Sequence, residues 1–124
     1  MNATNTKKTV IIGASDNPSR YSYLALHRLI GRGHPVVAIG AHSGKAAGVD
    51  ITTAHPQEAD VDTVTLYINP KRQPAYYDYI VSLQPRRVIF NPGTENEEFA
   101  QLLRNKGIEA KEACTLVMLA NGLF

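Results

Sequence analysis

Short apolar runs rich in β-branched residues alternate along this chain with segments of helical periodicity. The expected strands are residues 9–12, 35–39, 63–68, 86–90 and about 108–111. The expected helices run from residue 18 to about 30, from 74 to 84 and from about 95 to 106. Strands that alternate with helices predict a parallel sheet with right-handed crossovers and helices on both faces. The expected fold is therefore a doubly wound α/β fold with a five-stranded parallel sheet in three α/β/α layers.

Local signals predict where the helices begin and end. Asn17 is expected to cap the first helix, with Pro18 in its first turn. Thr94 and Glu97 are expected to form a capping box, in which each side chain bonds a backbone N–H group at the start of the third helix. Gly107 is the expected end of that helix.

The length of 124 residues and the 44% hydrophobic content predict one packed domain, residues 8–124, after a disordered or loosely ordered polar segment, residues 1–7. One cysteine excludes an intrachain disulfide. The net charge of +2 comes from scattered basic residues, which gives no case for nucleic acid. With no long apolar run and no secretory signal, we expect a cytoplasmic protein that does not enter membranes.

In a doubly wound fold the ligand lies beyond the carboxyl ends of the strands, where the strand order reverses. The loops that follow the expected strands are residues 13–20, 40–48, 69–72, 91–95 and 113–115. A phosphate at the first loop would meet backbone N–H groups and the positive end of a helix dipole, with Gly13 and Ala14 allowing close approach. Most of the unusual residues of the chain lie in these loops.

Two common nucleotide motifs are absent. A dinucleotide site shows G-x-G-x-x-G, but "GASDNP" has Ser15 in place of the second glycine, and no acidic residue follows the second strand. The stretch "GAHSGK" is no ATP-binding loop, because Ala46 follows Lys45. Lys45 instead favours a ligand with a phosphate near its ribose, and Arg20 could add a second charged contact. NADP and coenzyme A both carry a ribose phosphate.

Several motifs together resemble the small CoA-binding protein family. They are "GASDNPSRYSYLALHRLIGRGHPVVAIG", the spacing of Gly48 and Ile51, "NPGTENEEF", and "AC" before a closing apolar tail. The resemblance runs from about Lys8 to Phe124. It implies a Rossmann-like domain similar to the N-terminal domain of the succinyl-CoA synthetase α subunit, with coenzyme A or an acyl-CoA as the ligand.

The resemblance also implies roles for individual residues. The CoA phosphates would be lined by Gly13, Ala14, Ser15 and Asn17, with Arg20 and Tyr23 nearby. The adenosine ribose and its 3′-phosphate would be surrounded by Gly40, Ala41 and Lys45. The adenine or the start of the pantetheine arm would be bordered by Asn69 and Pro70, and the arm would be followed toward its thiol by Asn91, Pro92, Gly93, Thr94 and Glu95. Many relatives have an Asn-Pro pair where this chain has Gly40 and Ala41.

Cys114 follows the fifth expected strand, on the ligand side of the sheet. A lone cysteine is most often an inert apolar residue. The sharper hypothesis is that Cys114 approaches the CoA thiol and can form a mixed disulfide with it. Intact mass after incubation with oxidised CoA tests this hypothesis, because no adduct on the wild type would count against it.

No histidine pair has metal-ligand spacing, and the chain has neither G-x-S-x-G nor a carboxylate pair placed for acid–base chemistry. We therefore expect a stand-alone binding or regulatory domain without catalytic machinery. Two alternatives stay open: an NADP-dependent or acyl-transferring enzyme component with Cys114 as nucleophile, and a protein-interaction module with a vestigial pocket. A homodimer or another protein partner is compatible with each.

Overall fold

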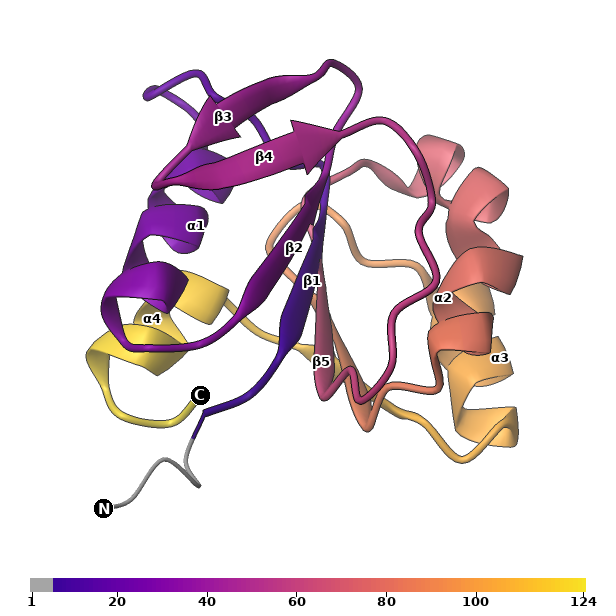
Figure 1. Ribbon diagram of the computed structural model, residues 1–124. Helices are drawn as coiled ribbons and strands as arrows, with labels where there is room; N and C mark the ends of the chain where they lie inside the picture. The colour runs from indigo at the N-terminus through magenta and orange to yellow at the C-terminus, as the bar shows by residue number, and fades with distance from the viewer. Residues whose placement is uncertain (1–5) are drawn as a thin grey trace.

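The computed structural model describes residues 6–124, and in this range seven strands form one sheet in the order β3-β4-β2-β1-β5-β6-β7 (Figure 1). The strands are β1 (Thr9–Ile12), β2 (Val36–Ile39), β3 (Gly44–Ala46), β4 (Val49–Thr52), β5 (Thr63–Leu66), β6 (Arg87–Phe90) and β7 (Glu109–Glu112). All neighbours are parallel except β3 and β4. Residues 1–5 of the expected loose N-terminal segment lie outside the described residues.

The prediction of a five-stranded sheet is wrong, because residues 40–52 contain a β-hairpin. β3 and β4 pair in antiparallel register, with Ala46 opposite Val49. The two residues between them, Ala47 and Gly48, have φ angles of 54° and 77°, which is the left-handed backbone of a tight two-residue hairpin turn. β4 then pairs in parallel with β2, so the hairpin extends one side of the sheet.

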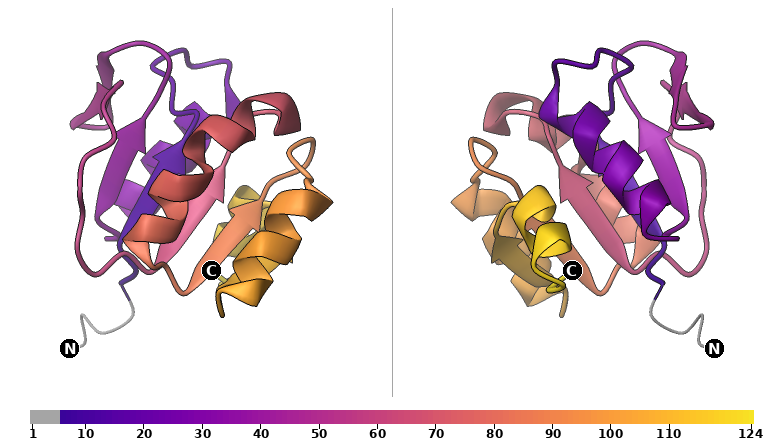
Figure 2. Two further views of the ribbon diagram at one scale, coloured as in Figure 1. Left: turned by 90° about the vertical axis from the view of Figure 1, so that its right-hand side faces the viewer. Right: turned by 90° about the vertical axis from the view of Figure 1, so that its left-hand side faces the viewer.

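Helices cover both faces of the sheet (Figures 1 and 2). They are α1 (Tyr21–Gly31), the 3₁₀ helix η2 (Pro70–Tyr76), α2 (Tyr77–Leu83), α3 (Glu97–Asn105) and α4 (Thr115–Ala120). Side chains alternate across β1: Val10 and Ile12 pack with α2 and α3, whereas Ile11 packs with α1 and α4. The α/β class and the helices on both faces therefore agree with the alternating sequence pattern.

Two expected helix caps are wrong. α1 begins at Tyr21, because the Asn17 side chain accepts hydrogen bonds from the N–H and hydroxyl groups of Ser19 and so holds a turn before the helix. α3 begins at Glu97, and its cap is Asn96, whose side chain accepts a hydrogen bond of 3.0 Å from the Phe99 N–H. Thr94 lies before the helix, so the expected capping box does not form.

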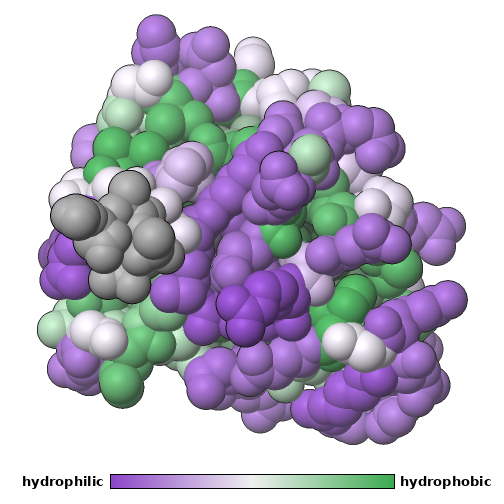
Figure 3. All heavy atoms as spheres, turned by 60° about the horizontal axis from the view of Figure 1, so that its bottom comes forward, coloured by the Kyte–Doolittle hydropathy of each residue, from purple (hydrophilic) through white to green (hydrophobic). Residues whose placement is uncertain are grey.

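His34 is a buried histidine at the end of the sheet opposite the carboxyl ends of the parallel strands. This end is mainly hydrophilic (Figure 3). The His34 side chain accepts a hydrogen bond of 2.9 Å at Nδ1 from the Lys7 backbone N–H and packs against the Phe124 ring. Burial, followed by the charges of Lys7, Arg87 and Arg32, lowers the pKa of His34 below its ordinary value of 6.5. The folded protein therefore favours the neutral imidazole.

Acidification should destabilise the fold through His34. Because the unfolded chain binds this proton more readily, the stabilisation is present above pH 6.5 and is lost as the pH falls through the lowered pKa of the folded state. Urea unfolding between pH 7.5 and 5.5 should show a falling free energy of unfolding in the wild type and a flatter profile in His34→Gln. Equal slopes in the two proteins would contradict this assignment.

None of the helices in the described part of the chain is long and apolar enough to cross a membrane.

Candidate binding groove at the carboxyl ends of the strands

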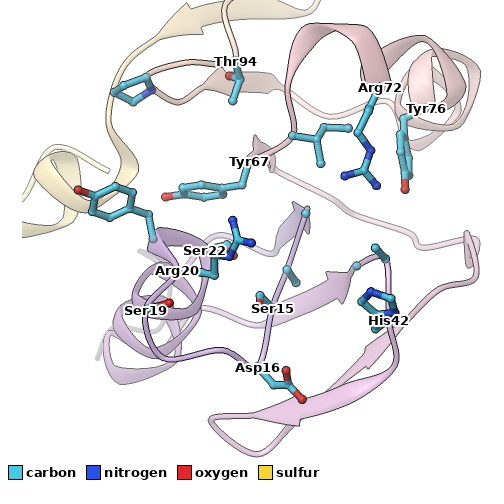
Figure 4. A pocket seen from close by; sticks show the side chains of 17 residues that line it. Ser15, Asp16, Ser19, Arg20, Ser22, His42, Tyr67, Arg72, Tyr76 and Thr94 are labelled. Atoms are coloured by element: carbon cyan, nitrogen blue, oxygen red, sulfur yellow. The ribbon is translucent and has the colours of Figure 1, made fainter.

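A groove of about 590 Å³ lies at the carboxyl ends of the parallel strands, at the point where the strand order reverses. β2 and β4 lie on one side of β1, and β5, β6 and β7 lie on the other, so the order reverses between β1 and β5. A doubly wound sheet binds ligands at this place. The groove is lined by Gly13, Ala14, Ser15, Asp16, Ser19, Arg20, Tyr21, Ser22, Gly40, Ala41, His42, Tyr67, Ile68, Arg72, Tyr76, Pro92 and Thr94 (Figure 4).

Two glycines let the backbone segments of the groove floor lie close together. Gly13 has φ of 96°, and a Cβ atom there would lie 2.8 Å from Ile68 Cγ2 and 3.0 Å from the Tyr67 carbonyl oxygen. A Cβ atom on Gly40 would collide with the carbonyl oxygen of Ala14. Both positions therefore need glycine for packing of the protein itself, independently of any ligand.

The backbone N–H groups of Gly13 and Ala14 are already engaged. Both donate to the Ile39 carbonyl oxygen, at 2.8 and 2.9 Å. The sequence suggested these two residues as the ones that let a phosphate approach the backbone, but in the structure their N–H groups join β1 to the end of β2. A ligand at this loop must use other donors.

The first turn of α1 supplies such donors. The N–H groups of Tyr21 and Ser22 have no acceptor within residues 6–124, as is usual in a first helical turn. Ser22 as a residue is only 4% exposed and lines the groove, and its hydroxyl has no hydrogen-bond partner among the described residues. A free hydroxyl on a groove lining at a helix N-terminus is well suited to bind an anion.

Two guanidinium groups from opposite walls add positive charge. Arg20 precedes α1 and Arg72 lies in η2, and in Figure 4 both side chains extend into the groove. Neither guanidinium forms an ion pair or hydrogen bond with a residue in the described range. Asp16 is the one carboxylate on the lining, so the positive charge of the two arginines exceeds the negative charge there. The electrostatics favour a negatively charged ligand.

A buried glutamine fixes the wall opposite α1. The Gln73 side chain is 0% exposed and donates to the carbonyl oxygens of Ile68, at 3.1 Å, and Thr94, at 2.7 Å. Asn96 in turn donates to Gln73 Oε1 at 2.9 Å. This network holds the segments after β5 and β6 together, which sets the position of Arg72 next to Gln73.

Tyr67 lines the groove between the two walls. Its hydroxyl is buried without a hydrogen-bond partner in the described residues. Burial raises the pKa of Tyr67 well above its ordinary value, against a smaller opposing influence of the nearby Thr115 and Thr65 hydroxyls. Tyr67 is therefore a neutral phenol at physiological pH.

The structure brings part of the predicted site together. Gly13, Ala14, Ser15, Arg20, Gly40, Ala41, Pro92 and Thr94 line the groove. Asn17, Tyr23, Lys45, Asn69, Pro70, Asn91, Gly93, Glu95 and Cys114 are not on this lining. The first group comes from the loops after β1, β2 and β6, so the placement of the site by topology agrees with the groove.

Residues off the lining include several with their own contacts. Lys45 belongs to β3, and its amino group is 3.8 Å from the Asp50 carboxylate. The Asn69 side chain caps η2 by accepting from the Arg72 N–H, and Glu95 accepts from the Gly93 N–H. Cys114 is the half-buried residue before α4.

Asn91 points into the protein below the groove. Its side-chain amide donates to Thr65 Oγ1 at 2.7 Å and to the Leu66 carbonyl oxygen at 2.8 Å. Its side-chain oxygen accepts from the Thr115 N–H at 2.8 Å. The Asn91 carbonyl oxygen also accepts from Thr94. Asn91 therefore supports the groove from beneath.

Sequence reasoning missed Asp16, Ser19, Tyr21, Ser22, His42, Tyr67, Ile68, Arg72 and Tyr76 on the lining. Asp16, Ser19, His42 and Arg72 lay inside the loops that topology singled out, so that signal was present. The apolar character of Tyr67 and Ile68 predicts that they continue the strand, but β5 ends at Leu66. Among the described residues, no group of three or more His, Cys, Asp and Glu side chains could hold a metal ion.

Comparisons with known proteins agree with this geometry. A family described as "CoA binding domain" matches residues 7–120. The crystal structure of an uncharacterized protein is similar over 96% of this chain and 98% of that chain, with 51% identity and a TM-score of 0.94. A conserved hypothetical protein from Pyrococcus furiosus is 26% identical over 90% of this chain and 97% of that chain, with a TM-score of 0.79.

A structure from Thermus thermophilus is 20% identical over 98% of this chain and 92% of that chain, with a TM-score of 0.86, which shows the shared fold. No curated protein matches the chain.

Proposed function

We propose that this chain, which belongs to the CoA-binding domain family, binds coenzyme A or an acyl-CoA in the groove between the loops after β1 and β5. The Rossmann-like fold, with its reversal of strand order at the groove, supports this proposal. Two arginines that face the groove suit a ligand with several phosphate charges.

The observation that carries the proposal is the state of the first turn of α1. Among residues 6–124, the Ser22 hydroxyl on the groove lining has no hydrogen-bond partner, and the N–H groups of Tyr21 and Ser22 have no acceptor. Together with the Arg20 guanidinium, these donors match the oxygen atoms of a pyrophosphate. In this proposal the pyrophosphate of CoA lies at the first turn of α1 and not at the N–H groups of Gly13 and Ala14, which are already engaged by Ile39.

Ser22→Ala should weaken CoA binding by about 10- to 100-fold, because a hydrogen bond to a charged group contributes about 1.5 to 3 kcal/mol. The free energy of unfolding of the free protein should change by less than about 0.5 kcal/mol, since the lost hydroxyl has no partner there. Calorimetric titration and urea unfolding measure the two effects. Ser43→Ala, an exposed serine outside the lining, is the matched control. Unchanged CoA affinity in Ser22→Ala would contradict the placement of the pyrophosphate.

The pantetheine arm is proposed to leave the pyrophosphate past Tyr67, Pro92 and Thr94. These residues lie on the β5 and β6 side of the groove, so the arm would run toward the segment before α4. Cys114 lies in that segment, and a contact between its thiol and the CoA thiol is part of the proposal. The mixed-disulfide experiment described above tests it.

We also propose that the protein acts as a stand-alone CoA-binding domain. In this view residues 8–124 act as one domain that binds the ligand without a catalytic step of its own, as in sensing or regulation through a partner. Turnover of acetyl-CoA or NADPH by the purified protein would contradict this role and would favour an enzyme component.

A further inference from the structure

We infer that Arg72 is the residue that recognises a phosphate on the ribose of the ligand and so selects CoA over dephospho-CoA. This inference rests on the proposed function, because it assigns one end of the same groove. It also differs from the expectation that Lys45 has this role.

Arg72 lines the groove on the wall opposite the end of β2. In a Rossmann-like fold the ribose of the adenosine lies beside the end of the second strand. Here the segment after β2 contributes Gly40, Ala41 and His42 to the lining, and no carboxylate is present among them. Figure 4 shows Arg72 on the opposite wall, extending toward the side of the groove that holds His42. A ribose at this place would have a guanidinium within the same cavity.

Hydrogen bonds hold the backbone of Arg72 in place. The Arg72 N–H donates to the carbonyl oxygen of Asn69, at 3.1 Å, and to its side-chain oxygen, at 3.2 Å. Gln73, the next residue, is locked by hydrogen bonds to Ile68 and Thr94. The base of the arginine is therefore fixed while its guanidinium has no ion-pair or hydrogen-bond partner in residues 6–124. Such a group can bind a phosphate in a bidentate manner without first breaking a protein contact.

Lys45 is the other candidate for this role. Its amino group is 3.8 Å from the Asp50 carboxylate, in a pair whose side chains are 67% and 87% exposed, and the residue is absent from the groove lining. Lys45 therefore lies on the exposed surface of the hairpin, whereas Arg72 lines the groove itself. Of these two cations, Arg72 is the better placed to contact a ribose phosphate.

The test is calorimetric titration of wild type and Arg72→Gln with CoA and with dephospho-CoA, which lacks the ribose phosphate. The wild type should bind CoA about 10- to 100-fold more tightly than dephospho-CoA, as expected for a charge-assisted hydrogen bond. Arg72→Gln should remove this preference by weakening CoA alone and should leave dephospho-CoA within about threefold. Arg72 is exposed, so the variant should fold, and its urea unfolding checks this.

Two matched variants complete the design. Lys71→Gln removes the neighbouring exposed cation, and Lys45→Gln removes the alternative candidate. Both should keep the preference for CoA. A preference that persists in Arg72→Gln, an equal loss of both ligands in that variant, or loss of the preference in Lys45→Gln would overturn the inference.

Titration of the wild type with CoA and dephospho-CoA distinguishes a failure of this inference from a failure of the proposed function. Equal binding of CoA and dephospho-CoA would overturn the role of Arg72 and leave CoA binding standing. Binding of neither ligand would overturn both.

Discussion

Gly13→Ala should lower the free energy of unfolding by about 2 to 5 kcal/mol and should greatly weaken CoA binding. Two costs add: the left-handed backbone at φ of 96° is strained for any side chain, at about 1 to 3 kcal/mol, and overpacking against a tight neighbour adds about 1 to 3 kcal/mol. The neighbours are Ile68 Cγ2, at 2.8 Å, and the backbone of Tyr67, at 3.0 Å, and the backbone cannot move aside as a flexible side chain would. The displaced loops would also change the shape of the groove. Urea unfolding and calorimetry measure the two effects.

Gly93→Ala is the matched control for this prediction. Gly93 has φ of 92°, almost the same as Gly13, but a Cβ atom there would meet nothing within 4 Å. This variant should therefore show only the backbone cost of about 1 to 3 kcal/mol. If the two substitutions destabilise the protein equally, the close approach of the loops after β1 and β5 is not what requires glycine at position 13.

Asn91→Ala should lower the free energy of unfolding by about 2 to 4 kcal/mol. The substitution leaves the Leu66 carbonyl oxygen and the Thr115 N–H without their present partner in a buried place, and each such group costs about 1 to 3 kcal/mol. Because Asn91 joins β5 to the start of α4, we expect α4 to lose protection first. Hydrogen exchange of the amides in residues 115–120 measures this change.

The control for Asn91 is Asn105→Ala. Asn105 is exposed, and within the described residues its side chain bonds only Gln101, so the free energy of unfolding should change by less than about 0.5 kcal/mol. An equally small effect of Asn91→Ala would mean that water replaces its hydrogen bonds and that Asn91 does not support the groove.

The parallel strands could be predicted because a buried strand is apolar on both faces. Val10, Ile11 and Ile12 are fully buried on the two sides of the sheet, and their sequence is uninterrupted and β-branched. β3 and β4 lacked this signal, since they are short and carry Lys45 and Asp50 at exposed positions. Their turn also places an alanine, Ala47, in the left-handed region, where sequence patterns lead one to expect glycine or asparagine.

The sequence indicates which loops line the candidate groove, but it does not indicate which backbone N–H groups and side chains are free to contact a ligand. The alternation of strands and helices points to the five loops after the expected strands, and four of them contribute to the groove lining, whereas residues 113–115 do not. Which N–H groups remain for a ligand depends on tertiary contacts, such as those that engage Gly13 and Ala14 with Ile39. The exposure of Arg72 to the groove depends on the buried Gln73, whose partners are far away in sequence.

A direct calorimetric titration of the purified wild-type protein tests whether the groove binds CoA. The ligands are CoA, acetyl-CoA, dephospho-CoA, NADP and NAD. We expect CoA or acetyl-CoA to bind with one ligand per chain and with clearly higher affinity than NADP or NAD. Absence of binding by CoA and acetyl-CoA, or an affinity for NADP equal to theirs, would contradict it.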